Sequence, residues 1–136
     1  MYVLSARAFR VSTFLATGRW PKTSPPVTVE TIRPAELESH RVLYFCLHGW
    51  EGDPVPYGDD EVPAISAGLV AQADLTGAIV YMAGCWGVGP VSEAMLDAGA
   101  AAVVADQDVN WSGYFLPKGS NALGRLFLRG LRLGAD

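Results

Sequence analysis

The chain has 136 residues, half of them hydrophobic, which fits one domain with a single core rather than two domains. Its formal net charge of -4 gives no basis for binding nucleic acid, which is itself strongly anionic. Two cysteines are too few for a disulfide framework, so we expect a reducing, cytoplasmic compartment.

Charge is distributed unevenly along the chain. Residues 42–117 contain ten acidic residues and neither Lys nor Arg, whereas the segments before and after are each net basic. A binding site in this middle segment would repel anionic ligands and attract cationic ones. An acidic surface that is simply solvated explains the same pattern, and both interpretations remain open here.

No segment has the pattern of a signal peptide or of a membrane span. The apolar run Val11–Ala16 is interrupted by Ser12 and Thr13 and is too short for a secretory signal. The uncharged segment Leu75–Ser92 contains several glycines and Pro90, which favours a buried strand followed by a loop. We therefore expect no association with a membrane.

The first 40 residues give a weaker pattern than the rest of the chain. Tyr2–Ala8 and Arg10–Ala16 each predict a strand, together forming a hairpin. Glycine and prolines predict a loop over Thr17–Pro26, and alternation of apolar residues predicts a strand over Val27–Ile32. Pro34 suits a first helical position, and one helical turn is expected after it, over Ala35–Ser39.

From residue 42 onward, strands and helices alternate. Three apolar runs predict buried strands, and Gly, Pro and Asp residues predict an exposed loop over Glu51–Asp60. The strands are expected within Val42–Gly49, Ala78–Gly87 and Ala100–Ala105, and helices over Pro63–Ala73, Val91–Ala98 and Asn121–Leu133. The inward side chains expected on the last two helices are Met95, Leu123, Leu126, Phe127 and Leu131, with Ser92 as a possible cap. This alternation predicts one α/β domain over residues 1–136, with a mainly parallel sheet covered by helices on both faces.

The two longest apolar strands end in similar ways. VLYFCLHG places His48 just past one strand, and AIVYMAGCWG places Cys85 just past the next. Parallel sheets bind ligands beyond the carboxyl ends of their strands, so we expect both side chains to meet in one crevice. A thiol beside an imidazole is the arrangement of a cysteine nucleophile with a general base. Gly49 leaves its backbone open to a ligand, and its N–H and that of Cys85 are candidate oxyanion donors.

A structural interpretation accounts for each residue taken singly. Cys85 is then a small buried hydrophobe and His48 a hydrogen-bonded strand terminus. Cys46 lies two residues before His48, hence on the same face, where core packing is the favoured interpretation over redox pairing. Trp50 and Trp86 follow the two motifs directly and either line a substrate groove or pack beneath the loops.

The order of elements from residue 41 onward resembles the caspase-like cysteine peptidase fold. It consists of a strand ending in His-Gly, a crossover, a strand ending in Gly-Cys-x-Gly, a helix and the strand AAAVVAD. The pattern is most similar to the bacterial CHAT domain and to separase, and it covers about residues 41–132. The resemblance implies that His48 is the general base and Cys85 the nucleophile, with no cofactor and no metal. The chain departs from that family at Gly84, where many members have alanine.

The charge pattern also bears on specificity. A pocket for an aspartate at P1, the residue before the scissile bond, requires arginine, and residues 42–117 contain none. Asp106 and Asp108 follow the AAAVVAD strand and Asp53 follows His48, so these three acids are the candidates for binding a basic P1 residue. Each is equally well interpreted as a loop acid that caps a turn.

Three functions are consistent with these patterns. The first is an endopeptidase that cleaves a protein or peptide after a basic residue, in particular Arg, through an acyl-enzyme. The second is a catalytically silent caspase-like module that binds a protein partner. The third is a thiol hydrolase of another kind on a flavodoxin-like sheet. A regulatory partner is compatible with any of them.

Overall fold

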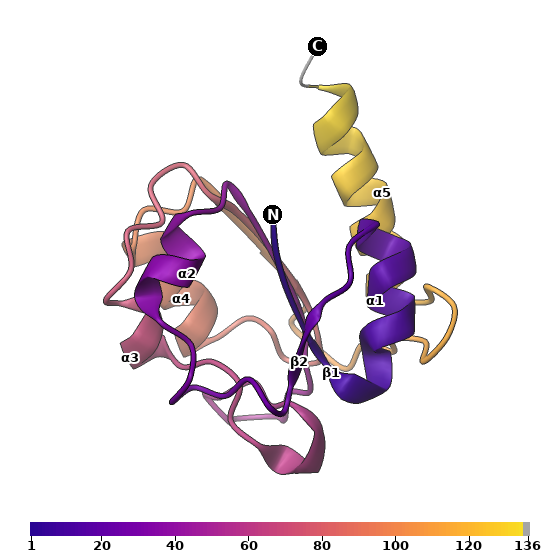
Figure 1. Ribbon diagram of the computed structural model, residues 1–136, viewed down its shortest axis with the longest axis horizontal. Coiled ribbons are helices and arrows are strands. Elements are labelled where there is room, and N and C mark those ends of the chain that lie inside the picture. The colour runs from indigo at the N-terminus through magenta and orange to yellow at the C-terminus, as the bar shows by residue number, and fades with distance from the viewer. Residues whose placement is uncertain (135–136) are drawn as a thin grey trace.

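The structure, a computed structural model, describes residues 1–134 and shows an α/β fold built on one parallel sheet (Figure 1). Five strands lie in the order β2-β1-β3-β4-β5, and every neighbouring pair is parallel. This confirms the predicted α/β class, and the order is that of flavodoxin-like sheets. The strands are β1 (Tyr2–Ala6), β2 (Lys22–Ser24), β3 (Val42–Cys46), β4 (Ile79–Ala83) and β5 (Ala102–Ala105).

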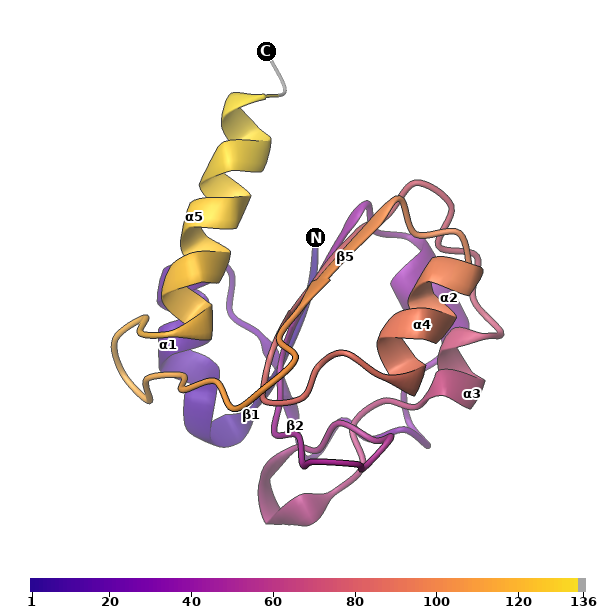
Figure 2. The same cartoon turned by 180° about the vertical axis from the view of Figure 1, so that it is seen from behind.

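Helices cover both faces of the sheet, as predicted. Figure 1 and Figure 2 show α1 and α5 side by side on one face and α2, α3 and α4 on the other. The chain leaves β1 toward β2 and later returns to β3 on the opposite side of β1, which creates a switch point where such folds bind ligands. The helices are α1 (Arg10–Thr17), α2 (Pro34–Glu38), α3 (Ala67–Val70), α4 (Pro90–Asp97) and α5 (Ser120–Leu133), with 3-10 turns η1 (Arg7–Phe9) and η2 (Asp59–Glu61).

The strand alternation divides the core into two clusters. Phe45 of β3 packs in the larger cluster, on the side of α2, α3 and α4. Tyr44 and Cys46 pack in the smaller cluster with Tyr81 of β4 and Leu128 of α5. Because side chains alternate along a strand, a residue two positions beyond Cys46 points to this smaller side.

Polar contacts anchor the start of α5 beneath the smaller cluster. Asn121 is fully buried; its carbonyl oxygen accepts a hydrogen bond from the Tyr44 hydroxyl at 2.7 Å. Its amide donates to Ser12 at 2.9 Å and to the Cys46 sulfur at 3.4 Å. Burial raises the pKa of the Tyr44 hydroxyl, which therefore stays protonated and donating. These bonds compensate the burial of polar groups and fix α5 against α1 and β3.

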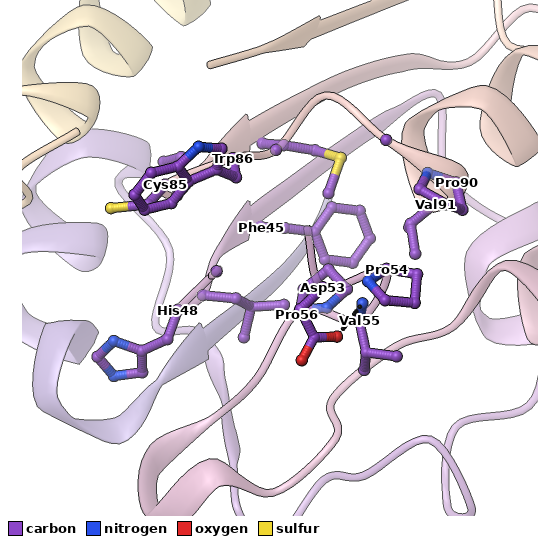
Figure 3. Close-up of a pocket in the computed structure, with 17 residues that line it drawn as sticks. Phe45, His48, Asp53, Pro54, Val55, Pro56, Cys85, Trp86, Pro90 and Val91 are labelled. Atoms are coloured by element: carbon purple, nitrogen blue, oxygen red, sulfur yellow. Dashed lines mark hydrogen bonds between the residues drawn. The ribbon is translucent and has the colours of Figure 1, made fainter. Parts of the chain in front are cut away.

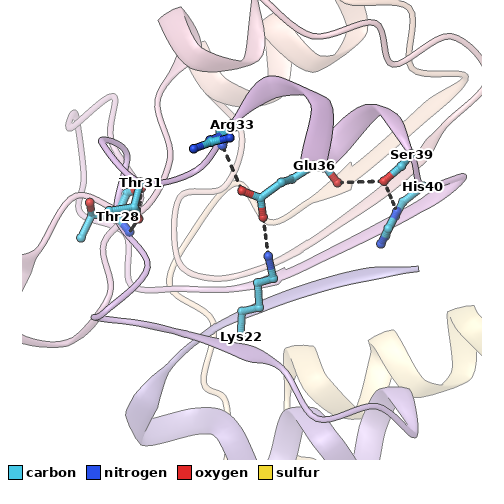
Figure 4. A network of polar contacts seen from close by, with 7 residues as sticks. All are labelled: Lys22, Thr28, Thr31, Arg33, Glu36, Ser39 and His40. Atoms are coloured by element: carbon cyan, nitrogen blue, oxygen red, sulfur yellow. Dashed lines mark hydrogen bonds and ion pairs between the residues drawn. The ribbon is translucent and has the colours of Figure 1, made fainter.

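The edge strand β2 is tied to α2 by a charged contact. Glu36 accepts a hydrogen bond from the Lys22 ammonium and another from the Arg33 backbone N–H at 3.3 Å (Figure 4). The Lys22 contact is the main reason that the pKa of Glu36 lies below its usual value. Both side chains are partly exposed, so the pair contributes little stability and mainly positions the two elements.

The amino-terminal predictions were partly wrong. Arg10–Ala16 forms helix α1 rather than a strand, because buried Ser12 and Thr17 satisfy their hydroxyls on helix carbonyls at 3.0 and 2.9 Å. Val27–Ile32 forms turns in which Thr28 bonds to Thr31, and β2 lies instead in the predicted loop. The strand at Tyr2 and the helical turn after Pro34 are confirmed.

Later in the chain, most predicted elements are confirmed with shifted boundaries. The helix predicted over 63–73 is limited to α3, because Ser66 caps it by accepting the Leu69 N–H at 3.3 Å. Ser92 lies in the first turn of α4 and helps to cap it, because its hydroxyl accepts the N–H of the N-cap residue Gly89 at 2.9 Å. Met95 is buried, as predicted.

The predictions for β5 and α5 were wrong in part. Strand β5 is an edge strand and only half-buried, with Val104 40% exposed. Leu123 and Leu126 are 56% and 65% exposed rather than inward, because α5 turns Asn121 and Leu128 toward the sheet. The side chains of Phe127 and Leu131 pack on the smaller cluster. Within residues 1–134, no helix combines the length and apolar character needed to cross a membrane.

Candidate active site

His48 and Cys85 lie beyond the carboxyl ends of two neighbouring strands, β3 and β4. In these strands Cys46 pairs with Ala83, so each candidate residue lies two positions past the last pair and shares its face with the smaller cluster. Both side chains line one cleft of about 530 Å³. Figure 3 shows the imidazole and the sulfur pointing to the same side of the sheet. The structure therefore brings the predicted pair to a common crevice.

Two glycines allow the strand ends to approach closely. A Cβ on Gly49 would lie 1.9 Å from the carbonyl oxygen of Cys85, and one on Gly84 would lie 2.5 Å from that of Leu47. Any other residue at either position would meet the opposing backbone, which is why the motifs contain glycine here. The backbones of the two motifs are thus held in contact.

The Cys85 thiol is half-buried and fixed by a neighbouring loop. It donates to the backbone carbonyl of Asn110 at 3.1 Å and accepts the backbone N–H of the same residue at 3.3 Å. Trp86, the next residue, has a left-handed φ of 46°, which is uncommon for a non-glycine residue and turns the chain sharply after the sulfur. Its N–H donates to the Asp108 carbonyl at 3.2 Å.

The predicted oxyanion donors remain available. Among residues 1–134, neither the Gly49 N–H nor the Cys85 N–H donates a hydrogen bond to a backbone or side-chain acceptor. Both residues are partly exposed, so these N–H groups are open to water or to a ligand. One belongs to the nucleophile residue and the other to the residue after His48, so both remain candidates for an oxyanion hole.

The His48 ring is held from two sides by residues that the sequence did not single out. Its Nε2 lies 3.4 Å from Oδ1 of Asp59, and the Phe9 ring packs against it with centroids 4.9 Å apart. The His48 backbone pairs with that of Tyr57 through bonds of 2.8 and 2.9 Å. The only sequence signal for Asp59 was its place in an acidic run after a glycine.

The two candidate acids after β5 lie outside the cleft. Asp106 accepts hydrogen bonds from the Asn110 amide and from the Ser120 hydroxyl at 2.9 Å, so it fixes the start of α5. Asp108 is exposed, and its carboxylate accepts the N–H of Val109 at 2.6 Å. Their contacts match the interpretation as turn-capping acids.

Asp53 is the one candidate acid that lines a pocket with Cys85, on the Phe45 side of the sheet and not the side to which the sulfur points (Figure 3). It lines a second, narrow pocket together with Cys85, Trp86 and the Pro54–Pro56 segment (Figure 3). Its carboxylate accepts the Val55 N–H at 3.0 Å and the Tyr57 hydroxyl at 2.9 Å. The bond from Tyr57 raises the pKa of that phenol, so it donates throughout the neutral range.

Aromatic side chains form much of the cleft wall. Trp50 and Trp86 both line it, as the groove interpretation predicted, and Trp50 is 51% exposed. Phe9 and Trp111 complete the wall, and Trp111 is 81% exposed. A peptide side chain entering this cleft would therefore meet mainly apolar surface.

Cys46 is structural rather than part of the cleft. It is completely buried, and burial raises the pKa of its thiol. Within residues 1–134, no group of three or more His, Cys, Asp or Glu side chains is placed to hold a metal ion. Comparisons with models of protein families, with curated proteins and with solved structures found no match to this chain.

Proposed function

We propose that this chain is a cysteine endopeptidase in which Cys85 is the nucleophile and His48 the general base. The observation that carries the proposal is that both side chains open on one cleft, beside the unpaired N–H groups of Gly49 and Cys85. Nucleophile, base and oxyanion donors are the three components that acyl transfer needs. The two free cysteines are consistent with a cytoplasmic location, which we propose with it.

The reaction follows from these positions. His48 takes the proton of the Cys85 thiol, and the sulfur attacks the scissile carbonyl carbon to form a tetrahedral intermediate. The carbonyl oxygen gains the negative charge and accepts hydrogen bonds from the Gly49 and Cys85 N–H groups. The imidazolium returns its proton to the leaving amine as the C–N bond breaks. Water, deprotonated by His48, then hydrolyses the thioester and frees Cys85.

The proposed substrate is a peptide with arginine at P1. The chain has no Lys or Arg between residues 42 and 117, so nothing there neutralises a P1 carboxylate. Asp53 lines the pocket adjoining Cys85, and a carboxylate has lone pairs beyond the two that its present bonds use. Arginine is favoured over lysine because its planar guanidinium binds a carboxylate through two hydrogen bonds.

A peptidyl-Arg acyloxymethyl ketone carrying biotin tests the proposal on the full chain. We expect one label per chain at Cys85, located by peptide mass mapping, because the thiolate displaces the acyloxy group only where a positioned base activates it. A peptidyl-Asp analogue serves as the matched probe and should label at least tenfold more slowly. A folded chain that takes up neither probe contradicts the proposal.

Replacing Asp53 by asparagine tests the specificity. We expect Asp53→Asn to lower kcat/KM for Arg substrates by about 10²-fold, because the guanidinium loses its charged hydrogen-bond partner. Asp108→Asn, whose carboxylate is exposed outside the cleft, is the matched control and should leave kcat/KM within twofold. Peptides that vary only at P1 give the measurement. A preference for P1 aspartate, or equal values in wild type and Asp53→Asn, would overturn the assignment.

A second function is favoured by one observation. The loop after Asp108 exposes Trp111, Phe115 and Leu116, which are 81%, 73% and 63% exposed. Exposed apolar side chains gathered on one loop are typical of protein contacts. If the folded chain reacts with neither peptidyl probe nor with simple thiol reagents, a catalytically silent module that binds a protein through this loop is the better proposal. If only simple thiol reagents react with it, a thiol hydrolase of another kind is favoured.

A further inference from the structure

Asp59 makes two contacts that join His48 to the 3-10 turn η1, which precedes α1. Its Oδ1 lies 3.4 Å from Nε2 of His48, and its Oδ2 accepts the backbone N–H of Ala8 at 3.0 Å. Since each oxygen has a different partner, the carboxylate cannot rotate freely about its last bond. It is thereby presented to the imidazole in one orientation.

The turn that carries Asp59 has an unusual backbone. Asp60 and Glu61 have φ values of 58° and 54°, a left-handed conformation that non-glycine residues rarely adopt twice in succession. Hydrogen bonds from Gly58 to Val62 (2.8 Å) and from Val62 to Asp59 (3.3 Å) hold this turn. Costly backbone geometry persists where the surrounding structure imposes it, and it is concentrated at functional sites.

The same segment folds back on the backbone of His48. Tyr57, two residues before Asp59, exchanges two hydrogen bonds with His48. On the other side, Phe9 packs on the imidazole and stacks on Tyr114 with centroids 5.5 Å apart. The ring is therefore confined between an aromatic wall and a carboxylate, and Nε2 is the nitrogen that faces the carboxylate.

We propose that Asp59 is the positioning residue of His48: it accepts Nε2–H and so leaves the Nδ1 lone pair to receive the Cys85 thiol proton. The contact between Asp59 and His48 stands by itself, whereas the role of Nδ1 as the base rests on the proposed function. In a neutral imidazole one nitrogen carries hydrogen and the other accepts, and the bond at one nitrogen decides the role of the other. When Nδ1 takes the thiol proton, the ring becomes a cation beside the Asp59 carboxylate.

The tautomer is measurable without any turnover. Two-bond ¹⁵N–¹H correlation spectra of the full chain labelled with ¹⁵N-histidine, recorded near pH 8 where an unperturbed imidazole is neutral, distinguish Nε2–H from Nδ1–H. We expect His48 to be mainly the Nε2–H tautomer, and His40→Gln assigns its signals, since the chain has two histidines. Asp59→Asn should reduce this preference at least threefold, because the asparagine amide can also donate to Nε2 and so stabilise Nδ1–H.

Asp60→Asn is the matched control, since its side chain is exposed on the same turn. It should leave the spectrum unchanged. If Asp59→Asn unfolds, the wild-type tautomer remains the test, and Asp59→Glu, which keeps the carboxylate, should preserve that tautomer. A His48 that is mainly the Nδ1–H tautomer in the wild type, or a tautomer ratio that Asp59→Asn does not change, overturns the inference.

Kinetics separate this inference from the proposed function. Asp59→Asn should lower kcat for Arg substrates by about 10²-fold or more while KM stays within threefold, since Asp59 acts on the base and not on the substrate. Asp59→Glu should recover part of the loss. An active wild type with unchanged kcat in Asp59→Asn rejects Asp59 as the positioning residue. An inactive wild type that has the expected tautomer rejects the peptidase and retains the contact.

Discussion

Cys85→Ala is expected to lower kcat/KM for Arg peptides by about 10⁴-fold or more and to leave the fold intact. The substitution removes the atom that forms the acyl-enzyme, and in nucleophile-and-base sites such a loss removes nearly all of the chemical step. The side chain is half-buried and ends beyond β4, so its removal opens no large cavity in either core cluster. The two sulfur contacts to Asn110 are the only bonds lost among those that the structure describes for this thiol.

Measuring the free energy of unfolding of each variant together with its activity distinguishes loss of catalysis from loss of the fold. The free energy of unfolding of Cys85→Ala should stay within about 1 kcal/mol of wild type, since sulfur hydrogen bonds are weak. His48→Ala should cause a comparable loss of turnover, whereas Cys46→Ser, which alters the other thiol, should keep most activity if it folds. Turnover near the wild-type rate in either Cys85→Ala or His48→Ala would exclude the proposed mechanism.

Gly49→Ala is expected to cause the largest loss of stability of any single methyl addition in the cleft, about 2–4 kcal/mol. The new Cβ would lie 1.9 Å from a backbone oxygen, and neither partner is a flexible side-chain end that can move aside. The ends of β3 and β4 would have to separate by more than 1 Å, a displacement sufficient to cost about 10²-fold in kcat/KM. Urea unfolding and peptide turnover give the two measurements.

The matched control is Gly68→Ala in α3. A Cβ at this position meets nothing within 4 Å, so alanine should be neutral or should stabilise by about 0.5–1 kcal/mol through helix propensity. If Gly49→Ala melted at the wild-type temperature, the close approach of the two strand ends would be disproved.

The main elements of the site could be predicted because they depend on short stretches of sequence. A strand buried on both faces is a continuous apolar run, as in VLYFCL and AIVYMA, and the residue past its end is fixed by counting. Predicting that His48 and Cys85 lie together needed only this count and the rule that the carboxyl ends of parallel strands lie at the same edge of the sheet. Their common face follows from alternation alone.

Asp59 was beyond this reasoning because its contact depends on the path of a loop. Asp59 lies eleven positions after His48, and the return of the chain requires left-handed backbone at Asp60 and Glu61. No residue preference signals such a conformation at two acidic residues, where glycine or asparagine is the usual choice. The selection of Asp53 over Asp106 depended likewise on which loop reaches the pocket.

The errors in α1 and α5 have a common cause, which is that small polar residues of these helices face the sheet. Ser12 and Thr13 of α1 and Asn121 of α5 are buried, while Leu123 and Leu126 are exposed. A hydrophobic pattern assigns the leucines to the core, since it cannot foresee that a buried amide finds Tyr44, Ser12 and Cys46 as partners. For the same reason α1 was interpreted as a strand.

The outermost strands of the sheet are also its shortest. β2 has three residues and β5 has four, whereas the strands between them have five each. An exposed edge of a sheet offers unpaired N–H and C=O groups to any extended chain that it meets, and the number of such groups grows with strand length. By ending in short strands, the sheet limits how many bonds a neighbouring molecule can form at its edges, and this restrains edge-to-edge aggregation.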